Sequence, residues 1–203
     1  MERRTGRLVV AMTGASGAIY AIRFLRQAVR HWDRIHLLVS DQAAQVANTE
    51  LGLDVAPGRV SVEALLGAPE PRIELLAGRD YFTPPASGSY RHDGMVVVPC
   101  SMGSAGRIAN GVSDCLTSRA ADVCLKERRP LILVVRETPW SLIHLRSLTA
   151  CAEAGAVIMP ACPGFYHRPG SIEELVDSVV ARILQQLGVD HHLTPEWQTE
   201  AKS

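Results

Sequence analysis

The sequence lacks the features that mark several specialised classes of protein. Its five cysteines include no CxxC pair, so neither a disulfide framework nor a cysteine-based zinc site is indicated. Its seven histidines form no HExxH motif, and we expect no bound metal. No apolar run approaches a membrane span, and Leu8–Met12, which follows the basic N-terminus, is too short for a secretory signal. We therefore expect a cytoplasmic protein with no membrane partner.

An excess of charge of either sign is also missing. Lys plus Arg and Asp plus Glu both number 21, so no overall field favours nucleic acid, and we expect no nucleic-acid partner. An anionic ligand would have to be held by cations placed locally. A net charge near zero also does little to oppose self-association.

What the chain does contain is an alternation of short apolar runs and helical patterns. Because the apolar runs do not alternate with polar residues, they predict strands that are buried on both faces, as in a parallel sheet. The pattern predicts a doubly wound α/β fold with three layers, Rossmann-like or flavodoxin-like. The expected strands are Arg7–Met12, Arg34–Val39, Gly94–Val98, Leu131–Val135 and Ala156–Met159, and the clearest helices are Ala18–His31, Asp41–Thr49, Trp140–Glu153 and Ile172–Leu187.

The length of 203 residues suits one domain. We assign residues 1–190 to that domain and residues 191–203 to a C-terminal tail that packs on a neighbouring subunit. Residues 54–93 are rich in proline, and we interpret them as an irregular excursion with one short helix. Helical patterns fill the segment between the third and fourth strands.

Ligands of doubly wound folds bind at the carboxyl ends of the strands, so the loops after the strands are the candidates for a site. In the first loop, Thr13–Gly17, small residues would let backbone amides approach an anion, although a tight turn explains them equally well. Ser40 follows the second strand and is typical of a helix cap. The third strand leads into Ser101–Ser104, which is a second candidate for anion binding. None of these loops is a GxGxxG or Walker motif.

Charged and aromatic residues near the later strands leave two readings open. Arg136 and Glu137 end the fourth strand, where they either meet solvent or enter the ligand crevice as an anion holder and a base. Tyr166 stands in a loop shaped by prolines, which is either a rigid turn or part of a site. Arg182 lies among apolar residues of the last helix and either extends to solvent or points at a bound phosphate.

Several longer strings resemble one family. TGASGAIY, PCSMGSAGRIANG, RAADVCLKERRPLILVVRETP, GAVIMP and PGFYHRP closely resemble the flavin prenyltransferases, the UbiX group of the flavin-binding decarboxylase superfamily. The resemblance covers the chain from about Leu8 to Leu187. It implies transfer of a dimethylallyl group from dimethylallyl monophosphate to N5 and C6 of reduced FMN. It also implies a homo-oligomer, a dodecamer, whose product, prenylated FMN, serves a UbiD-type decarboxylase.

The resemblance also implies roles for individual residues, in three groups. The catalytic group is Ser16, Glu50, Lys126 and Glu137. The FMN-binding group is Gly14, Ala15, Ser16, Ser40, Ser101, Met102, Gly103, Ser104 and Arg136. The group that binds the dimethylallyl phosphate is Ser89, Tyr90, Arg119, Lys126, Tyr166, Arg182 and Trp197. The chain departs from the usual family pattern at Tyr90, where relatives often carry Trp or Phe, and at Ser104-Ala105-Gly106.

Two other functions are weighed against this one. An FMN-dependent cysteine decarboxylase of the same superfamily would carry a PASANT-like stretch, and the nearest string here is PPASGSY. A non-catalytic flavin-binding or regulatory subunit would be expected to have lost the phosphate-binding set, whereas Lys126, Glu137, Tyr166 and Arg182 are all present.

Overall fold

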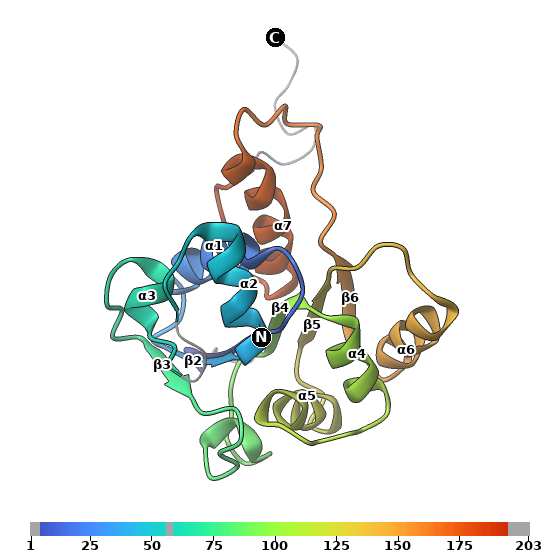
Figure 1. Ribbon diagram of the computed structural model, residues 1–203. Coiled ribbons are helices and arrows are strands. Elements are labelled where there is room, and N and C mark those ends of the chain that lie inside the picture. Colours follow the sequence, from blue (N-terminus) through green and yellow to red (C-terminus); the bar gives the residue numbers. More distant parts are fainter. Residues whose placement is uncertain (1–4, 56–58, 195–203) are drawn as a thin grey trace.

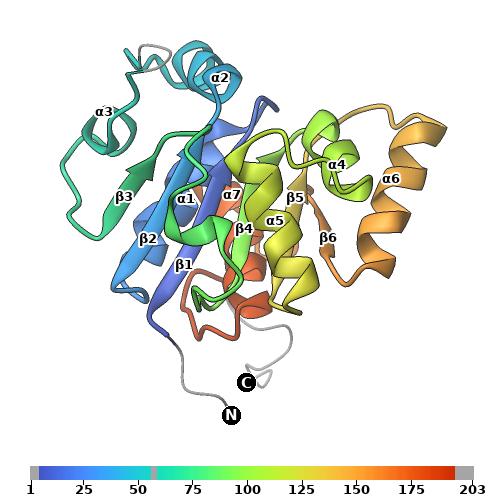
Figure 2. The same cartoon turned by 90° about the horizontal axis from the view of Figure 1, so that it is seen from below.

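The described residues of the computed structural model, 5–55 and 59–194, form a six-stranded parallel sheet with helices on both faces (Figure 1, Figure 2). The strand order is β3-β2-β1-β4-β5-β6. This arrangement confirms the predicted doubly wound α/β fold with three layers. The strands are β1 Arg7–Met12, β2 Arg34–Val39, β3 Ile73–Leu76, β4 Met95–Cys100, β5 Leu131–Val135 and β6 Val157–Pro160.

Each face of the sheet has its own hydrophobic core. In β1, Leu8, Val10 and Met12 point into one core, whereas Val9 and Ala11 point into the other. The first core lies under α1 Ala18–Ala28, α2 Asp41–Leu51, α3 Val62–Leu66 and α7 Ile172–Gln186, and the second under α4 Met102–Ala109, α5 Leu116–Lys126 and α6 Leu142–Glu153. Burial on both faces explains why β1, β4 and β5 are apolar along almost their whole length.

The prediction for residues 54–93 is wrong in one respect, because the segment contains a strand. Ile73–Leu76 pairs in parallel with β2 and forms one edge of the sheet. An edge strand needs a partner on one side only, and Ile73 and Leu76 are buried while Glu74 is exposed. The short helix expected in this segment is present as α3.

Most element boundaries agree with the predictions within two or three residues. The first helix ends at Ala28 rather than at His31, because the chain turns there and places Trp32 in the core. The indole nitrogen of Trp32 donates to Asp93 at 3.0 Å. The sixth helix starts at Leu142, directly after Ser141, whose hydroxyl accepts a hydrogen bond from the amide of His144.

No helix within residues 5–55 and 59–194 is both long and apolar enough to span a membrane. In the same ranges, no group of three or more His, Cys, Asp or Glu side chains could hold a metal ion. Most of the predicted C-terminal tail, including Trp197, lies outside the described residues.

Candidate active site

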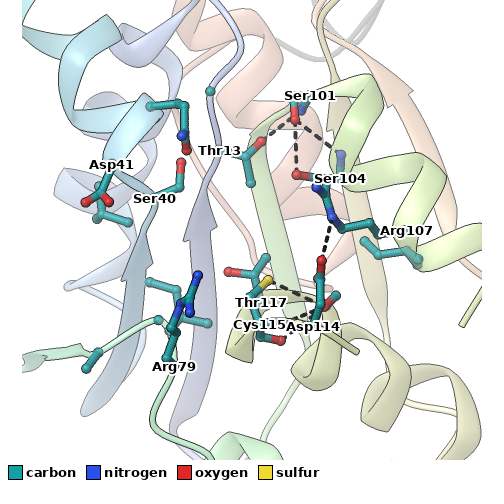
Figure 3. A pocket seen from close by; sticks show the side chains of 18 residues that line it. Thr13, Ser40, Asp41, Arg79, Ser101, Ser104, Arg107, Asp114, Cys115 and Thr117 are labelled. Carbon is teal, nitrogen blue, oxygen red and sulfur yellow. Dashed lines mark hydrogen bonds and ion pairs between the residues drawn. The ribbon is translucent and has the colours of Figure 1, made fainter. Parts of the chain in front are cut away.

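A cleft of about 700 Å³ opens at the carboxyl ends of β1, β2 and β4 (Figure 3). It lies where the strand order changes direction: the helix after β1 covers one face of the sheet and the helix after β4 covers the other. Ligands of doubly wound folds bind at this switch point. At the strand ends the cleft is lined by small residues, most of them polar. These residues are Thr13, Gly14, Ser40, Ser101 and Ser104.

Thr13 joins the loop after β1 to the loop after β4. Its buried hydroxyl donates to the carbonyl of Pro99 and accepts from the amide of Ser101, both at 2.8 Å. One side chain therefore fixes the end of β1 relative to the start of α4. The sequence pattern placed Thr13 in the first loop without assigning it this role.

The two serine junctions act as helix caps and line the cleft at the same time. The Ser40 hydroxyl accepts from the amide of Ala43 at 3.1 Å, and the Ser101 hydroxyl accepts from the amide of Ser104 at 3.3 Å. The hydroxyls of Ser101 and Ser104 also lie 3.0 Å apart. A capping serine keeps a hydroxyl at the mouth of the cleft, so the structural role and a ligand-binding role are compatible here.

The first loop is packed too tightly for a larger residue at position 14. A Cβ on Gly14 would lie 2.5 Å from Cβ of Gln42, so the end of β1 can approach α2 only with glycine there. Ala15 is buried and Ser16 is half-buried beside it. Of the other predicted FMN contacts, the Met102 side chain is buried in the core beneath α4, and the Gly103 carbonyl accepts from Arg107 at 3.1 Å.

The amide groups that begin α1 are held by a side chain of the protein. The carboxylate of Glu50, near the end of α2, accepts from the amide of Gly17 at 2.9 and 3.0 Å and from the amide of Ala18 at 2.8 Å. Gly17 adopts the left-handed conformation, with φ of 102°, which aims its amide at this carboxylate. Two of the amides that could hold an anion at the start of α1 are thus already paired with a carboxylate of the protein.

Four more predicted residues follow β5 and β6 or lie on α7, and all four are exposed. Arg136 and Glu137 directly follow β5, Tyr166 stands in the loop after β6, and Arg182 lies on α7. The loop after β6 is tied to α7, because the Gly164 amide donates to the Ser178 hydroxyl at 3.3 Å. Arg182 donates to the side chain of Gln185.

The pKa of Tyr20, on α1, is influenced by residues that follow β5 and β6. Burial raises the pKa of Tyr20, the nearby Cys162 also raises it, and the charge of Arg136 lowers it. Tyr20 on α1 therefore lies close to the arginine that ends β5. Since α1 begins beside Glu50, the first loop and the ends of β5 and β6 face one region of the molecule.

Tyr90, another of the predicted donor-binding residues, lies at the opposite, amino-terminal end of the sheet. The Tyr90 hydroxyl lies 2.7 Å from Nε2 of His36, and the guanidinium of Arg7, the first residue of β1, lies 5.1 Å from the centre of its ring. Arg129, just before β5, donates to the carbonyl of Tyr90 at 2.7 Å. One chain therefore does not bring Tyr90 to the cleft.

Ser89 and Lys126 lie at this same end, and Arg119 lies on α5 between Lys126 and the α5 residues that line the cleft. Arg119 donates to the carbonyl of Ala86 at 3.1 Å, which joins α5 to the loop that carries Ser89. Lys126 ends α5, and a Cβ on Gly88 would lie 2.8 Å from its ammonium nitrogen. Together Ser89, Arg119 and Lys126 form a polar surface, which we call the distal surface.

The cleft also contains residues for which the sequence pattern gave no prediction. They include Arg79, which follows β3, and Arg107, Asp114 and Thr117, from α4, the following turn and α5. Arg107 donates to Asp114 at 3.0 Å. Because β3 itself was not predicted, nothing in the sequence pattern indicated that Arg79 stands at the end of a strand beside the others.

The cleft suits a phosphorylated heteroaromatic ligand such as FMN. Its volume lies within the range of about 300–1,000 Å³ usual for small-molecule sites. Hydroxyls of Ser40, Ser101, Ser104 and Thr117 and the guanidinium of Arg79 line it, and these groups match the ribityl hydroxyls and the phosphate of FMN. The small residues at Gly14 and Ala15 leave room beside β1.

Comparison with known proteins shows the family of this chain. Residues 1–184 match the family model described as Flavoprotein. Flavin prenyltransferase UbiX of Pseudomonas aeruginosa is 46% identical over 195 residues, covering 94% of this chain and 93% of the relative. Flavin prenyltransferase UbiX of Synechocystis is 45% identical over 197 residues, covering 94% of this chain and 95% of the relative.

Solved structures show the same likeness in three dimensions. AnUbiX, in a crystal structure with FMN and dimethylallyl pyrophosphate, superimposes with a TM-score of 0.85 at 43% identity, covering 98% of this chain and 100% of its own. A dodecameric FMN-dependent UbiX-like decarboxylase from Escherichia coli O157:H7 gives 0.81 at 38% identity, covering 95% of this chain and 99% of its own. The chain belongs to the flavin prenyltransferase family, within the flavoproteins.

Proposed function

We propose that the protein is a flavin prenyltransferase that uses reduced FMN and dimethylallyl monophosphate. The cleft at the switch point carries this proposal, because its hydroxyls, its small first loop and its unpaired arginine suit FMN. The relatives named above support the same activity. Reduced FMN would supply the nucleophilic N5 and C6: N5 bonds to C1 of the dimethylallyl group as phosphate leaves, and C6 bonds to C3. N5 and C6 each lose a proton and C2 of the dimethylallyl group takes one up, so one proton is released overall.

The side chains of the protein would supply charge and proton transfer. We assign Arg136 to flavin binding and Glu137 to removal of a proton, because both stand at the carboxyl end of β5. Ser16 lies in the first loop, where its hydroxyl can orient the flavin. Departure of phosphate from the allylic group requires cations, and Arg182 and Lys126 can provide them without a metal.

We infer that the donor site is completed by a second copy of the chain. Tyr166, in the loop after β6, belongs to the cleft end of the molecule, whereas Lys126, at the end of α5, lies on the distal surface. These groups can meet only if the distal surface of one subunit faces the cleft end of another. The dodecameric relative supports such an assembly, and we propose a dodecamer here.

The cysteine decarboxylase alternative has weaker support. The FMN-dependent cysteine decarboxylase TvaF superimposes with a TM-score of 0.59 at 18% identity, a likeness that shows the fold alone. The regulatory alternative predicts loss of the phosphate-binding set, whereas Lys126, Glu137, Tyr166 and Arg182 are all present in the chain.

The decisive experiment is a mass measurement of the flavin. The protein is mixed without oxygen with reduced FMN and either dimethylallyl monophosphate or dimethylallyl pyrophosphate. A flavin heavier by one dimethylallyl unit supports the proposal, and the two donors distinguish the phosphate form. An unchanged flavin mass with both donors, when FMN binds, would reject it.

We further propose that the prenylated FMN is passed to a UbiD-type decarboxylase and that the protein acts in the cytoplasm. The five cysteines, Cys100, Cys115, Cys124, Cys151 and Cys162, are all free thiols, as expected in a reducing compartment. The transfer is tested by adding purified product to a decarboxylase that lacks its cofactor and measuring release of carbon dioxide.

A further inference from the structure

The charged groups that already have partners within the protein indicate where in the cleft the phosphate of FMN can bind. The amides that begin α1 are the first place to expect a phosphate, but the Glu50 carboxylate accepts hydrogen bonds from two of them, those of Gly17 and Ala18. A phosphate there would meet a carboxylate of the same sign. The phosphate is therefore expected elsewhere in the cleft.

The cleft contains two arginines, and only one of them is paired. The guanidinium of Arg107 donates to Asp114 at 3.0 Å and to the carbonyl of Gly103 at 3.1 Å, so its charge is balanced within the protein. Among the described residues, the side chain of Arg79 makes no hydrogen bond or ion pair. Arg79 points from the end of β3 into the cleft, toward the space between Ser40 and Thr117 (Figure 3).

Hydroxyl groups surround the space that Arg79 faces. Ser40, which follows β2, stands on one side, and Ser101 and Ser104 stand on the other side at the start of α4. Hydroxyls donate hydrogen bonds to phosphate oxygens, and a guanidinium can hold two of these oxygens at once. An unpaired cation facing these donors is the arrangement expected of a phosphate site.

We propose that Arg79 binds the phosphate of FMN, together with the hydroxyls of Ser40, Ser101 and Ser104. This inference rests on the proposed function and deepens it, since it assigns one end of the ligand to one part of the cleft. The flavin ring then extends from Ser40 and Ser101 toward the first loop and Arg136. Arg79 is a binding residue rather than a catalytic one.

The test compares two flavins that differ only in the phosphate. Dissociation constants of FMN and of riboflavin are measured by flavin fluorescence for the full-length wild-type chain and for Arg79→Gln. We expect the substitution to weaken FMN binding by about 10- to 100-fold and to leave riboflavin binding unchanged. Arg79→Lys keeps the charge but not the paired donors, and we expect it to weaken FMN binding less.

Arg30→Gln is the matched control, because Arg30 is exposed after α1 and does not line the cleft. A wild-type chain that binds FMN no better than riboflavin would overturn the proposal, as would an Arg79→Gln chain that keeps the wild-type preference for FMN. Failure of the proposed function looks different: FMN would bind through Arg79, yet no prenylated flavin would form.

Discussion

The Tyr90 hydroxyl lies 2.7 Å from Nε2 of His36, a side chain that is fully buried in β2. This bond joins the loop before β4 to the middle of the sheet. It also turns the Tyr90 hydroxyl into the protein rather than toward the cleft. Tyr90 thus holds its loop in place. The same loop carries Ser89, which is a residue of the distal surface.

Removing this hydroxyl should destabilise the fold. In Tyr90→Phe, Nε2 of His36 stays buried without its partner, which costs about 1–2 kcal/mol. Thermal unfolding followed by circular dichroism should show a Tm lower by roughly 2–8 °C. Tyr81→Phe is the control, since the Tyr81 hydroxyl donates to the Ser113 carbonyl at the exposed surface. Equal stability of Tyr90→Phe and the wild type would contradict this role for the bond.

His92 should make stability dependent on pH. Burial lowers the pKa of its imidazole from 6.5 to about 4, although a hydrogen bond to the Gly94 carbonyl acts in the opposite direction. Between these two values the unfolded chain binds more protons than the folded chain, so stability decreases as the pH falls from about 6.5 toward 4. The full loss from this group is roughly 3 kcal/mol.

The measurement is Tm between pH 7.5 and pH 4.5 for the wild type and for His92→Asn. The variant should lose less stability over this interval, because asparagine does not titrate. His36, whose pKa burial also lowers, remains in both proteins and acts in the same direction. Identical pH profiles of the two proteins would show that His92 does not carry the effect.

Thr13 should be required for both stability and flavin binding. Thr13→Val removes the hydroxyl that joins Pro99 to Ser101 and leaves a buried carbonyl and the Ser101 amide without this partner. We expect a loss of about 1–3 kcal/mol and FMN binding weaker by about tenfold, because the start of α4 is no longer fixed. Thr13→Ser keeps the hydroxyl and should restore most of the binding. If Thr13→Val bound FMN normally, the link between the loops would not shape the site.

Glu137 should affect the rate of product formation and not the affinity of the protein for FMN. Its carboxylate is exposed beyond β5 and accepts from the Thr138 amide at 3.0 Å, a bond that Gln can also accept. In Glu137→Gln, product formation followed by flavin mass should slow by about 10²- to 10⁴-fold, as for loss of a general base. The FMN dissociation constant should stay within about twofold of the wild type. A loss of FMN binding would instead assign Glu137 a structural role.

The proposed shared site predicts that two inactive variants restore each other. Lys126→Ala removes a residue of the distal surface, and Glu137→Gln removes one at the cleft end of the molecule. If these residues act across subunits, random mixing after dissociation and reassembly should restore about a quarter of the wild-type rate. Mixing Glu137→Gln with a chain that carries both substitutions provides the control and should restore nothing. Equal activity of both mixtures would place the two residues in the same subunit's site.

Much of the fold was predictable because it depends on local patterns. The apolar runs of β1, β2 and β5 are long enough to stand out, and their burial on both faces removes the alternation that would mark an exposed strand. β3 was not predictable in the same way. It has four residues, one of them exposed and charged, and pairing with β2 rather than local preference makes it a strand.

By itself the sequence determined the sheet's main strands, the serine caps and the family, since each depends on neighbouring residues or on strings of them. Only the tertiary structure decided which polar side chains from distant segments come into contact. Glu50 reaches α1 across 33 residues and pairs with two amides at its start, and Tyr90 reaches His36 across 54. Arg79 enters the cleft because β3 joins the sheet edge. Contacts between distant segments depend on how the layers pack, and no local pattern records that packing.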